Sequence, residues 1–402
     1  ALAAGHRVSP QVDAAAGVQM GAYRAVLTLP GGELPFGFEL EGAGASTVAY
    51  LVNGKERVLL NEVTVLGTHL DIRMPGYENR LTADASGGRL VGEVVLSKPD
   101  GKQQHIALHA QRGQQFRFFE KSAGASADVS GRWAVKFTDD SGKPELAVGE
   151  FSQSHDVITG TFLAETGDHR YLAGQVKGDE LYLSTFDGAH AFLYKAKVGS
   201  DGELTGDFWV GTALHERWVG QRDANASLPD AYSLTTLRAG ATQFNFAFPD
   251  LAGRRISSND PKFQGKVMIV ALAGSWCPNC HDEAAFLEPL YKEYRGKGVE
   301  IVSLMFEHFG DFPQAVEATQ RFRRHYGIEY TTLIAGISNK DEAAKKLPML
   351  DRVYAFPTTL FVDRKGRVRK IHTGFSGPAT GDHYTQFVAE VKATLDQLLA
   401  ET

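Results

Sequence analysis

The chain has 402 residues, of which 43% are hydrophobic and 22% charged, and its formal net charge is −6. This length predicts two or three domains, and the composition is typical of a soluble globular protein. The small negative charge offers no support for nucleic acid or an acidic membrane surface as a partner. The sequence opens on "ALAA", which is typical of a cleaved signal peptide and is equally consistent with a trimmed chain. No apolar run approaches the roughly 18 to 20 residues that span a bilayer.

The N-terminal part, after a tail at 1–14, favours β structure. Short runs of alternating hydrophobicity are separated by turn signals such as "PGG" and "PDGK", a pattern typical of sandwiches and barrels. There is also a weak internal repeat. The segment "GGRLVGEVVL" (87–96) resembles "DGELTGDFWV" (201–210), and the distance in sequence between the two segments is close to that between Tyr23 and Trp133. We therefore predict two related β units, at 15–120 and 130–225.

A predicted linker at 226–242 leads to a region of different character, 243–402. Its first predicted strand is "KVMIVALAG" (266–274), a continuous apolar run typical of a strand buried on both faces. Apolar residues at helical intervals follow. The expected elements after the first strand are, in chain order, a helix at 281–295, a strand at 299–306, a helix at 313–325, strands at 358–363 and 367–373, and a helix at 383–400. This order predicts an α/β domain with a mixed sheet.

The only two cysteines, Cys277 and Cys280, stand where the first strand gives way to the helix. Unpaired N–H groups and the partial positive charge at a helix N-terminus stabilise a thiolate, so we expect Cys277 to be the nucleophile. Cys280, one turn further, can close a disulfide with it, and Trp276 would flank that disulfide. A zinc site needs further ligands, and His281 is poorly placed to supply one; an inert disulfide in so short a loop stabilises little. Redox chemistry is therefore favoured. We expect His281 to be exposed, with a possible role in stabilising the Cys277 thiolate.

Residues 243–402, about 40% of the chain, resemble the thioredoxin-like thiol-disulfide oxidoreductases of the TlpA/ResA type. The resemblance lies in the opening "FNFAFPDLAGRRI", the motif "GSWCPNC", Glu283 three residues after the second cysteine, and "YAFPTTLFVDRKGRV". It implies a thioredoxin fold for this region only. The N-terminal β region carries no resemblance that we recognise.

The same resemblance implies roles for three further residues. Pro357 would be a cis-proline facing the disulfide, and it would turn the backbone of Phe356 toward an extended substrate. Glu283 would lie near Cys280 and accept its proton, as a partly desolvated carboxylate can. Thioredoxins proper carry a buried Asp six residues before the first cysteine, where this chain has Ala271. That departure leaves Glu283 as the only candidate base nearby.

The function expected from these features is that of a protein-disulfide oxidoreductase, and the resemblance implies that it acts as a reductase of disulfides in exported proteins. Its partners would be a disulfide-containing protein and a membrane thiol-electron donor, and its location periplasmic or otherwise exported. No cofactor is expected beyond the redox-active Cys277–Cys280 disulfide, and no metal.

Two other functions remain open. A reduced CxxC pair binds Cu(I), so the domain could deliver copper, with His372 as a third ligand. A thiol peroxidase is less favoured, because residues 273–275 lack the Pro and Thr of the peroxidase loop. In the β region we predict no catalytic residues, since its histidines are scattered. That region is expected to dock the α/β domain, to mediate self-association or to bind substrate.

Overall fold

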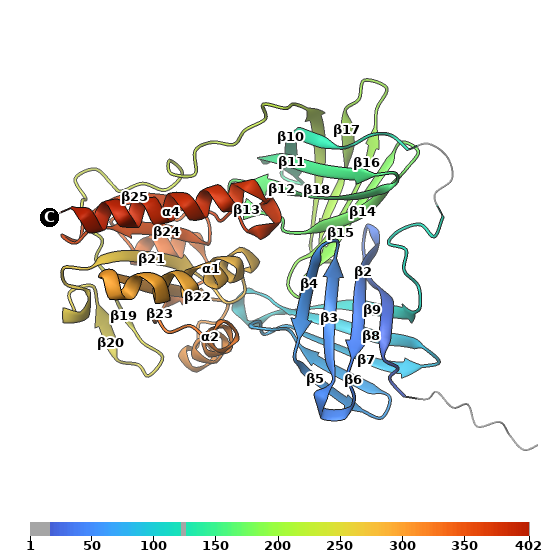
Figure 1. The fold of residues 1–402 in the computed structure, drawn as a ribbon, viewed down its shortest axis with the longest axis horizontal. Helices are drawn as coiled ribbons and strands as arrows, with labels where there is room; N and C mark the ends of the chain where they lie inside the picture. Colours follow the sequence, from blue (N-terminus) through green and yellow to red (C-terminus); the bar gives the residue numbers. More distant parts are fainter. Residues whose placement is uncertain (1–16, 122–125, 402) are drawn as a thin grey trace, which may run out of the picture.

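The computed structural model describes residues 17–121 and 126–401, so the tail predicted at 1–14 lies outside the described residues. Two β units lie against each other, and an α/β domain packs beside both of them (Figure 1). The prediction of an all-β N-terminal part followed by a thioredoxin-like α/β domain is confirmed.

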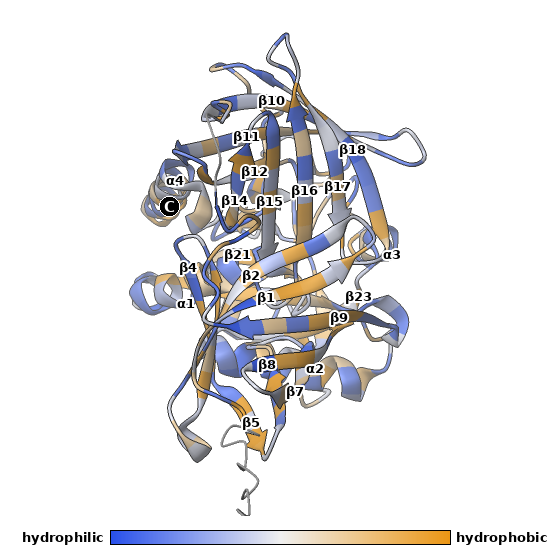
Figure 2. Ribbon diagram, turned by 90° about the vertical axis from the view of Figure 1, so that its right-hand side faces the viewer, coloured by the Kyte–Doolittle hydropathy of each residue, from blue (hydrophilic) through white to orange (hydrophobic). Residues whose placement is uncertain are grey.

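The first β unit is a nine-stranded antiparallel sheet in which β1 pairs with both β2 and β9. Strands such as β9 alternate buried and more exposed residues, as the sequence pattern predicts. Figure 2 shows hydrophilic and hydrophobic residues interspersed along the β strands. The sheet order is β4-β3-β2-β1-β9-β8-β7-β6-β5. The strands are β1 (Gly21–Leu29), β2 (Gly32–Glu41), β3 (Val48–Asn53), β4 (Glu56–Leu60), β5 (Glu62–Leu66), β6 (His69–Arg73), β7 (Arg80–Ser86), β8 (Arg89–Ser97) and β9 (Gln103–Arg112).

The second β unit is also nine-stranded, and its sheet closes on itself because β11 pairs with β12 as well as with β10. Closure removes the exposed edges that open sheets leave. The strands are β10 (Gly131–Asp139), β11 (Pro144–Ser154), β12 (Val157–Ala164), β13 (Gly167–Asp168), β14 (Leu172–Lys177), β15 (Glu180–Phe186), β16 (Ala191–Val198), β17 (Leu204–Val210) and β18 (Leu214–Arg222).

The two β units begin in the same way, about 110 residues apart in the sequence. In the first unit the Tyr23 hydroxyl donates to the backbone oxygen of Gln19, four residues earlier. In the second, Nε1 of Trp133 donates to the backbone oxygen of Val129, also four residues earlier. The two strands start at glycines with positive φ, Gly21 and Gly131. These shared contacts support the interpretation of an internal repeat.

The α/β domain has a five-stranded mixed sheet of order β23-β22-β21-β24-β25, in which β21, β22 and β23 are parallel and β24 and β25 antiparallel to their neighbours. A two-stranded ribbon precedes it. The elements are β19 (Ala247–Pro249), β20 (Arg255–Ser257), β21 (Val267–Ala273), α1 (Pro278–Tyr294), β22 (Val299–Glu307), α2 (Phe312–Tyr326), β23 (Thr331–Ile337), α3 (Lys340–Lys346), β24 (Thr358–Val362), β25 (Val368–Thr373) and α4 (Asp382–Ala400).

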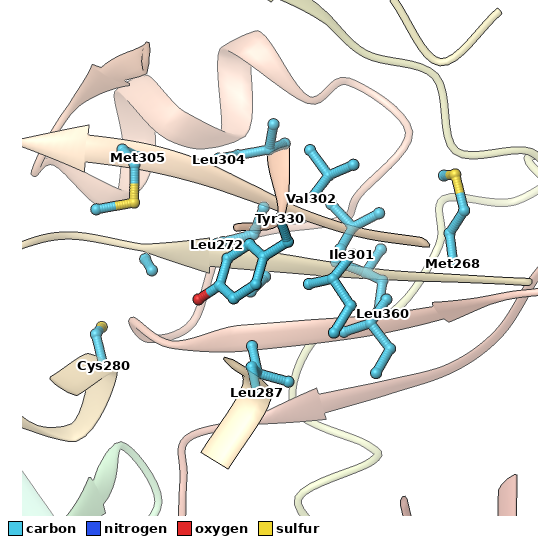
Figure 3. Close-up of a cluster of buried hydrophobic side chains, with 14 of the residues drawn as sticks. Met268, Leu272, Cys280, Leu287, Ile301, Val302, Leu304, Met305, Tyr330 and Leu360 are labelled. Carbon is cyan, nitrogen blue, oxygen red and sulfur yellow. The ribbon is translucent and has the colours of Figure 1, made fainter. Parts of the chain in front are cut away.

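All seven residues of β21 are buried, as the apolar run predicts. Its side chains and those of β22 form the core that Figure 3 shows, with Cys280 at the end of the cluster. Four elements of this domain were absent from the prediction, namely β19, β20, β23 and α3. Helix α3 is only seven residues long and buries a single side chain, Ala343, so its sequence carries little hydrophobic periodicity.

The three parts of the molecule share buried contacts. Phe186 and Leu193 of the second β unit belong to the core of the first, and Nδ2 of Asn53 donates to the backbone oxygen of Phe186 at 2.8 Å. The segment predicted as a linker runs along the α/β domain, where Nε of Arg238 donates to the backbone oxygen of Leu350 at 2.9 Å. The first β unit also contacts the α/β domain, where Nε of Arg321 donates to the Glu78 carboxylate at 2.8 Å.

Candidate active site

Cys277 and Cys280 lie at the N-terminus of α1, and both are free thiols in this structure. Cys277 is the N-cap residue, and its sulfur accepts a hydrogen bond from the backbone N–H of Cys280 at 3.2 Å. Pro278 follows at the first helical position, where its missing N–H leaves no bond unmade. The two thiols are only 4% and 1% exposed. The helix thus directs backbone N–H groups at the first sulfur and places the second one turn behind it.

The loop before β24 faces the first thiol. The Phe356–Pro357 peptide bond is cis, and the Cys277 thiol lies 3.5 Å from the backbone oxygen of Phe356, to which it donates. Trp276 is held beside them, because its Nε1 donates to the backbone oxygen of Phe306 at 2.8 Å and its ring meets the Phe356 ring edge-on at 5.9 Å. The structure therefore brings Trp276, Phe356 and Pro357 together around Cys277.

Glu283 is buried in the same helix, 2% exposed, and accepts a hydrogen bond from the Thr359 hydroxyl. Burial raises the pKa of Glu283 to about 7, although the bond from Thr359 acts in the opposite direction. The pKa of Cys280 is raised well above its usual value by burial, by the bond with Cys277, and by the charges of Cys277 and Glu283. A carboxyl group that titrates near neutrality beside a thiol that resists ionisation can exchange a proton with it.

A second buried carboxyl group, Glu307 at the end of β22, was missed by sequence reasoning. It accepts bonds from the backbone N–H of Ser275 at 3.2 Å, from the Ser275 hydroxyl at 2.6 Å and from the Thr319 hydroxyl at 2.9 Å. Burial raises its pKa to about 7. Glu307 thus anchors the loop that leads into Cys277. A lone acid at the end of a hydrophobic strand was the one available signal.

The expectation that His281 is exposed is wrong, since the side chain is buried. Its Nε2 donates to the backbone oxygen of Ser275 at 2.7 Å, so Nδ1 accepts from the Tyr326 hydroxyl, also at 2.7 Å. The Tyr77 ring of the first β unit stacks on it at a centroid distance of 3.7 Å. Burial lowers the pKa of His281 to about 3. The imidazole is therefore neutral and committed to these contacts, and it supplies no positive charge to Cys277.

The β region does contain a buried constellation of charged residues, which the sequence analysis did not foresee. Arg170, between β13 and β14, bonds to Asp187 of its own unit, to Glu56 of the first unit and to Asp282 of α1. These four residues are scattered over 227 positions of the sequence, so no local sequence pattern predicts the cluster. Only their convergence in space forms the cluster.

His372, the suggested third copper ligand, is buried and bonds through Nδ1 to the backbone oxygen of Gly374 at 3.0 Å. In the described part of the chain, no three His, Cys, Asp or Glu side chains are grouped closely enough to bind a metal ion. Within the same residues, none of the helices has the length and apolar character needed to cross a membrane.

A thioredoxin-like sheet with a dithiol at the N-terminus of its first long helix and a cis-proline opposite defines a thiol-disulfide oxidoreductase. Residues 239–371 match the family model described as the AhpC/TSA family. The thiol-disulfide oxidoreductase ResA of Halalkalibacterium halodurans is 31% identical over 137 residues, which is 34% of this chain and 69% of that protein. ResA of Bacillus subtilis is 28% identical over 139 residues, 35% of this chain and 69% of that protein. Through its α/β domain the chain belongs to the ResA family.

Solved structures similar to this one cover about two fifths of the chain. A thiol:disulfide interchange protein of the thioredoxin family from Chlorobium tepidum TLS aligns with 41% of this chain and 100% of its own, with a TM-score of 0.31 and 17% identity. A secreted thiol-disulfide isomerase from Corynebacterium glutamicum aligns with 44% of this chain and 96% of its own, with a TM-score of 0.33 and 17% identity.

Proposed function

We propose that this oxidoreductase is a disulfide reductase whose working groups are Cys277, Cys280 and Glu283. Its substrates would be disulfides of exported proteins, and its location periplasmic or otherwise exported. The observation that carries the proposal is the paired arrangement at α1, with one sulfur capping the helix and the other buried beside a carboxyl group. This arrangement gives the two thiols different tasks.

In the first step the Cys277 thiolate attacks one sulfur of the substrate disulfide. A bond forms between that sulfur and Cys277, the substrate S–S bond breaks, and the other substrate sulfur leaves as a thiolate. The backbone of Phe356, next to Pro357, is where an extended substrate would pair, and Trp276 would cover its other side. At the N-terminus of α1 the backbone N–H of Cys280 already donates to the attacking sulfur at 3.2 Å.

In the second step Cys280 gives its proton to Glu283, and its sulfur attacks Cys277. The mixed disulfide breaks, the second substrate thiolate is released, and the Cys277–Cys280 disulfide forms. The substrate has gained two electrons and the enzyme has lost two. A thiol donor at the membrane would return them by reducing this disulfide.

The division of labour can be tested by trapping. We expect the reduced full-length Cys280→Ser variant, mixed with glutathione disulfide, to accumulate one glutathione on Cys277, because the resolving sulfur is missing. The wild type should pass through this adduct to its intramolecular disulfide, and Cys277→Ser should form no adduct. Mass spectrometry of the quenched, unreduced protein measures the three species. Equal adduct formation by Cys277→Ser and Cys280→Ser would show that the roles are wrongly assigned.

A further inference from the structure

The cluster around Arg170 joins all three parts of the molecule beside the dithiol. The guanidinium binds Asp282 of α1 with two hydrogen bonds, at 3.0 and 3.1 Å. It also binds Asp187 of the second β unit at 2.7 Å and Glu56 of the first at 2.9 Å. The Arg170 side chain is 11% exposed, and its backbone has a φ of 59°, which is uncommon for a residue with a long side chain. Asp282 stands two residues after Cys280, so this junction lies on the active-site helix itself.

Two further contacts cover the same turn of α1. Nδ2 of Asn279, between the cysteines, donates to the backbone oxygen of Asp168 at 3.1 Å. The Asp168 carboxylate in turn accepts from the backbone N–H of Gly377 at 2.8 Å. On the other side of the turn, Tyr77 stacks on His281. The residues between and just after the cysteines, which a partner protein would have to approach, are thus occupied by the β units.

Next to the residues that flank Cys277, a small space lies between the three parts of the molecule, and neither sulfur lines it. A cavity of about 180 Å³ lies where the three parts meet, below the roughly 300 to 1,000 Å³ of pockets that hold drug-sized ligands. Its walls include Lys98 of the first β unit, Phe192 of the second, and Trp276 and Pro278 on either side of Cys277. A small disulfide can enter such a space, whereas the surface of a folded protein cannot.

We propose that Arg170 sets the size of the disulfide that reaches Cys277, by holding both β units over the dithiol. The closed molecule then takes low-molecular-weight disulfides, and a disulfide in a folded protein reacts only when the Arg170 contacts are released. This inference rests on the disulfide-reductase chemistry proposed above. The chemical steps are the same two thiol–disulfide exchanges, so electrons and protons balance as they do there. Arg170 is a positioning residue, since it touches Asp282 and neither sulfur.

The test compares a small and a bulky reagent on the reduced full-length protein. Iodoacetamide and a maleimide carrying a long polyethylene glycol chain report access to the thiols without any exchange chemistry. Hydroxyethyl disulfide, which is small enough for this space, and insulin are the matched pair of disulfides. For the wild type we expect the bulky member of each pair to react much more slowly than the small one. In Arg170→Ala the bulky reactions should accelerate at least about tenfold, because breaking a buried, hydrogen-bonded charge pair weakens the junction severely. The small reactions should change little.

Three other variants keep the result interpretable if Arg170→Ala folds poorly. Arg170→Lys retains the charge but not the two-pronged bond to Asp282, so it should be intermediate. Tyr77→Ala removes a separate contact on the same turn and should also admit the bulky reagents. Arg369→Ala breaks an ion pair with Glu401 inside the α/β domain and should behave as the wild type does.

The outcomes separate the two proposals. For each protein, the rate with the bulky reagent is divided by the rate with the small one. If this ratio is the same in the wild type, Arg170→Ala and Tyr77→Ala, the size control by Arg170 is refuted. If the alkylating reagents are discriminated by size but neither disulfide oxidises any variant, the size control stands and the reductase proposal fails.

Discussion

Two buried carboxyl groups support the dithiol, and their contacts differ at the level of single atoms. Glu283 bonds to Thr359, and its charge raises the pKa of Cys280. Glu307 instead bonds to Ser275, at the start of the active-site loop. Burial raises the pKa of each carboxyl group to about 7. The pair therefore offers a matched comparison between a group placed to exchange a proton with a thiol and a group that holds a loop.

Replacing Glu283 by Gln should change the pH dependence of the second exchange step. In the wild type the carboxyl group is protonated below its raised pKa of about 7, so the rate should rise as the pH increases through that value. Glu283→Gln should lose this inflection and be slower by roughly 10²-fold near pH 7, a usual contribution of a general base. Stopped-flow measurement of decay of the mixed disulfide, from pH 5 to 9, gives the profile.

Glu307→Gln is the control, because it removes a carboxyl group of the same raised pKa that bonds to Ser275 and Thr319. It should retain the inflection near pH 7 even where the altered loop changes the absolute rate. If the rate of the second exchange step in Glu283→Gln still showed an inflection near pH 7, the proposed proton transfer would be contradicted.

Spacing along the sequence predicted that Cys277 and Cys280 lie on one turn at a helix start, and the family resemblance added Glu283 of the same segment. Neither could select Glu307 or Arg170. Glu307 reaches Ser275 from 32 residues away, and Arg170 reaches Asp282 from 112 residues away. Contacts across such separations depend on how the chain folds back on itself, and a single sequence carries no local trace of them.

At the scale of elements, the segment β21–loop–α1 decides how strongly the dithiol oxidises or reduces. A strongly oxidising pair is one whose reduced form is stabilised. Here the Cys280 thiolate is disfavoured by burial and by the charges of Cys277 and Glu283, so the reduced form gains little from ionisation of that sulfur. We expect a reduction potential more negative than about −180 mV, below those of strongly oxidising folding enzymes.

The potential can be measured by equilibrating the full-length protein with glutathione buffers and quantifying the alkylated thiols by mass. A value near −120 mV would reverse the assigned direction and make the protein an oxidant.

The elements themselves were predicted where periodicity is strong. Strand β22, helix α2 and helix α4 begin and end within a residue or two of the expected ranges. β19, β20, β23 and α3 were missed. In the case of α3, a seven-residue helix with one buried side chain has almost no hydrophobic pattern to detect. For the β units, alternation predicted strands but not how the sheets close, since closure depends on the pairing of β11 with β12.

At the scale of the whole molecule, buried titratable groups give stability two opposing pH dependences. The pKa values of Glu283 and Glu307 are raised to about 7, so their contribution to stability is lost as the pH rises through that value. Burial lowers the pKa values of His169, His281 and His308 to about 3, so their contribution is lost as the pH falls below the usual 6.5.

Because three such histidines oppose two such carboxyl groups, we expect the free energy of unfolding to rise with pH between about pH 4.5 and 6.5. It should then fall between about pH 6.5 and 7, where only the carboxyl groups still titrate differently in the two states. Urea unfolding at a series of pH values measures it. Glu283→Gln should lose less stability than the wild type between about pH 6 and 8, because one of the groups responsible for that loss is gone. A steady rise in stability from about pH 5 to 8 would show that the buried carboxyl groups do not have raised pKa values in the folded protein.

The sequence by itself indicated the class of chemistry: local spacing placed a dithiol at a helix start, and the family resemblance added a proline loop and a carboxyl group one turn on. Local spacing suffices for the dithiol because backbone geometry carries both cysteines to one turn, whereas the proline loop reaches Cys277 from 79 residues away. Only the tertiary structure decided access to that chemistry. The covering of Cys277, the neutral buried state of His281 and the junction at Arg170 all arise where separately encoded surfaces meet, and burial between them is what alters the charges and the exposure of the groups involved.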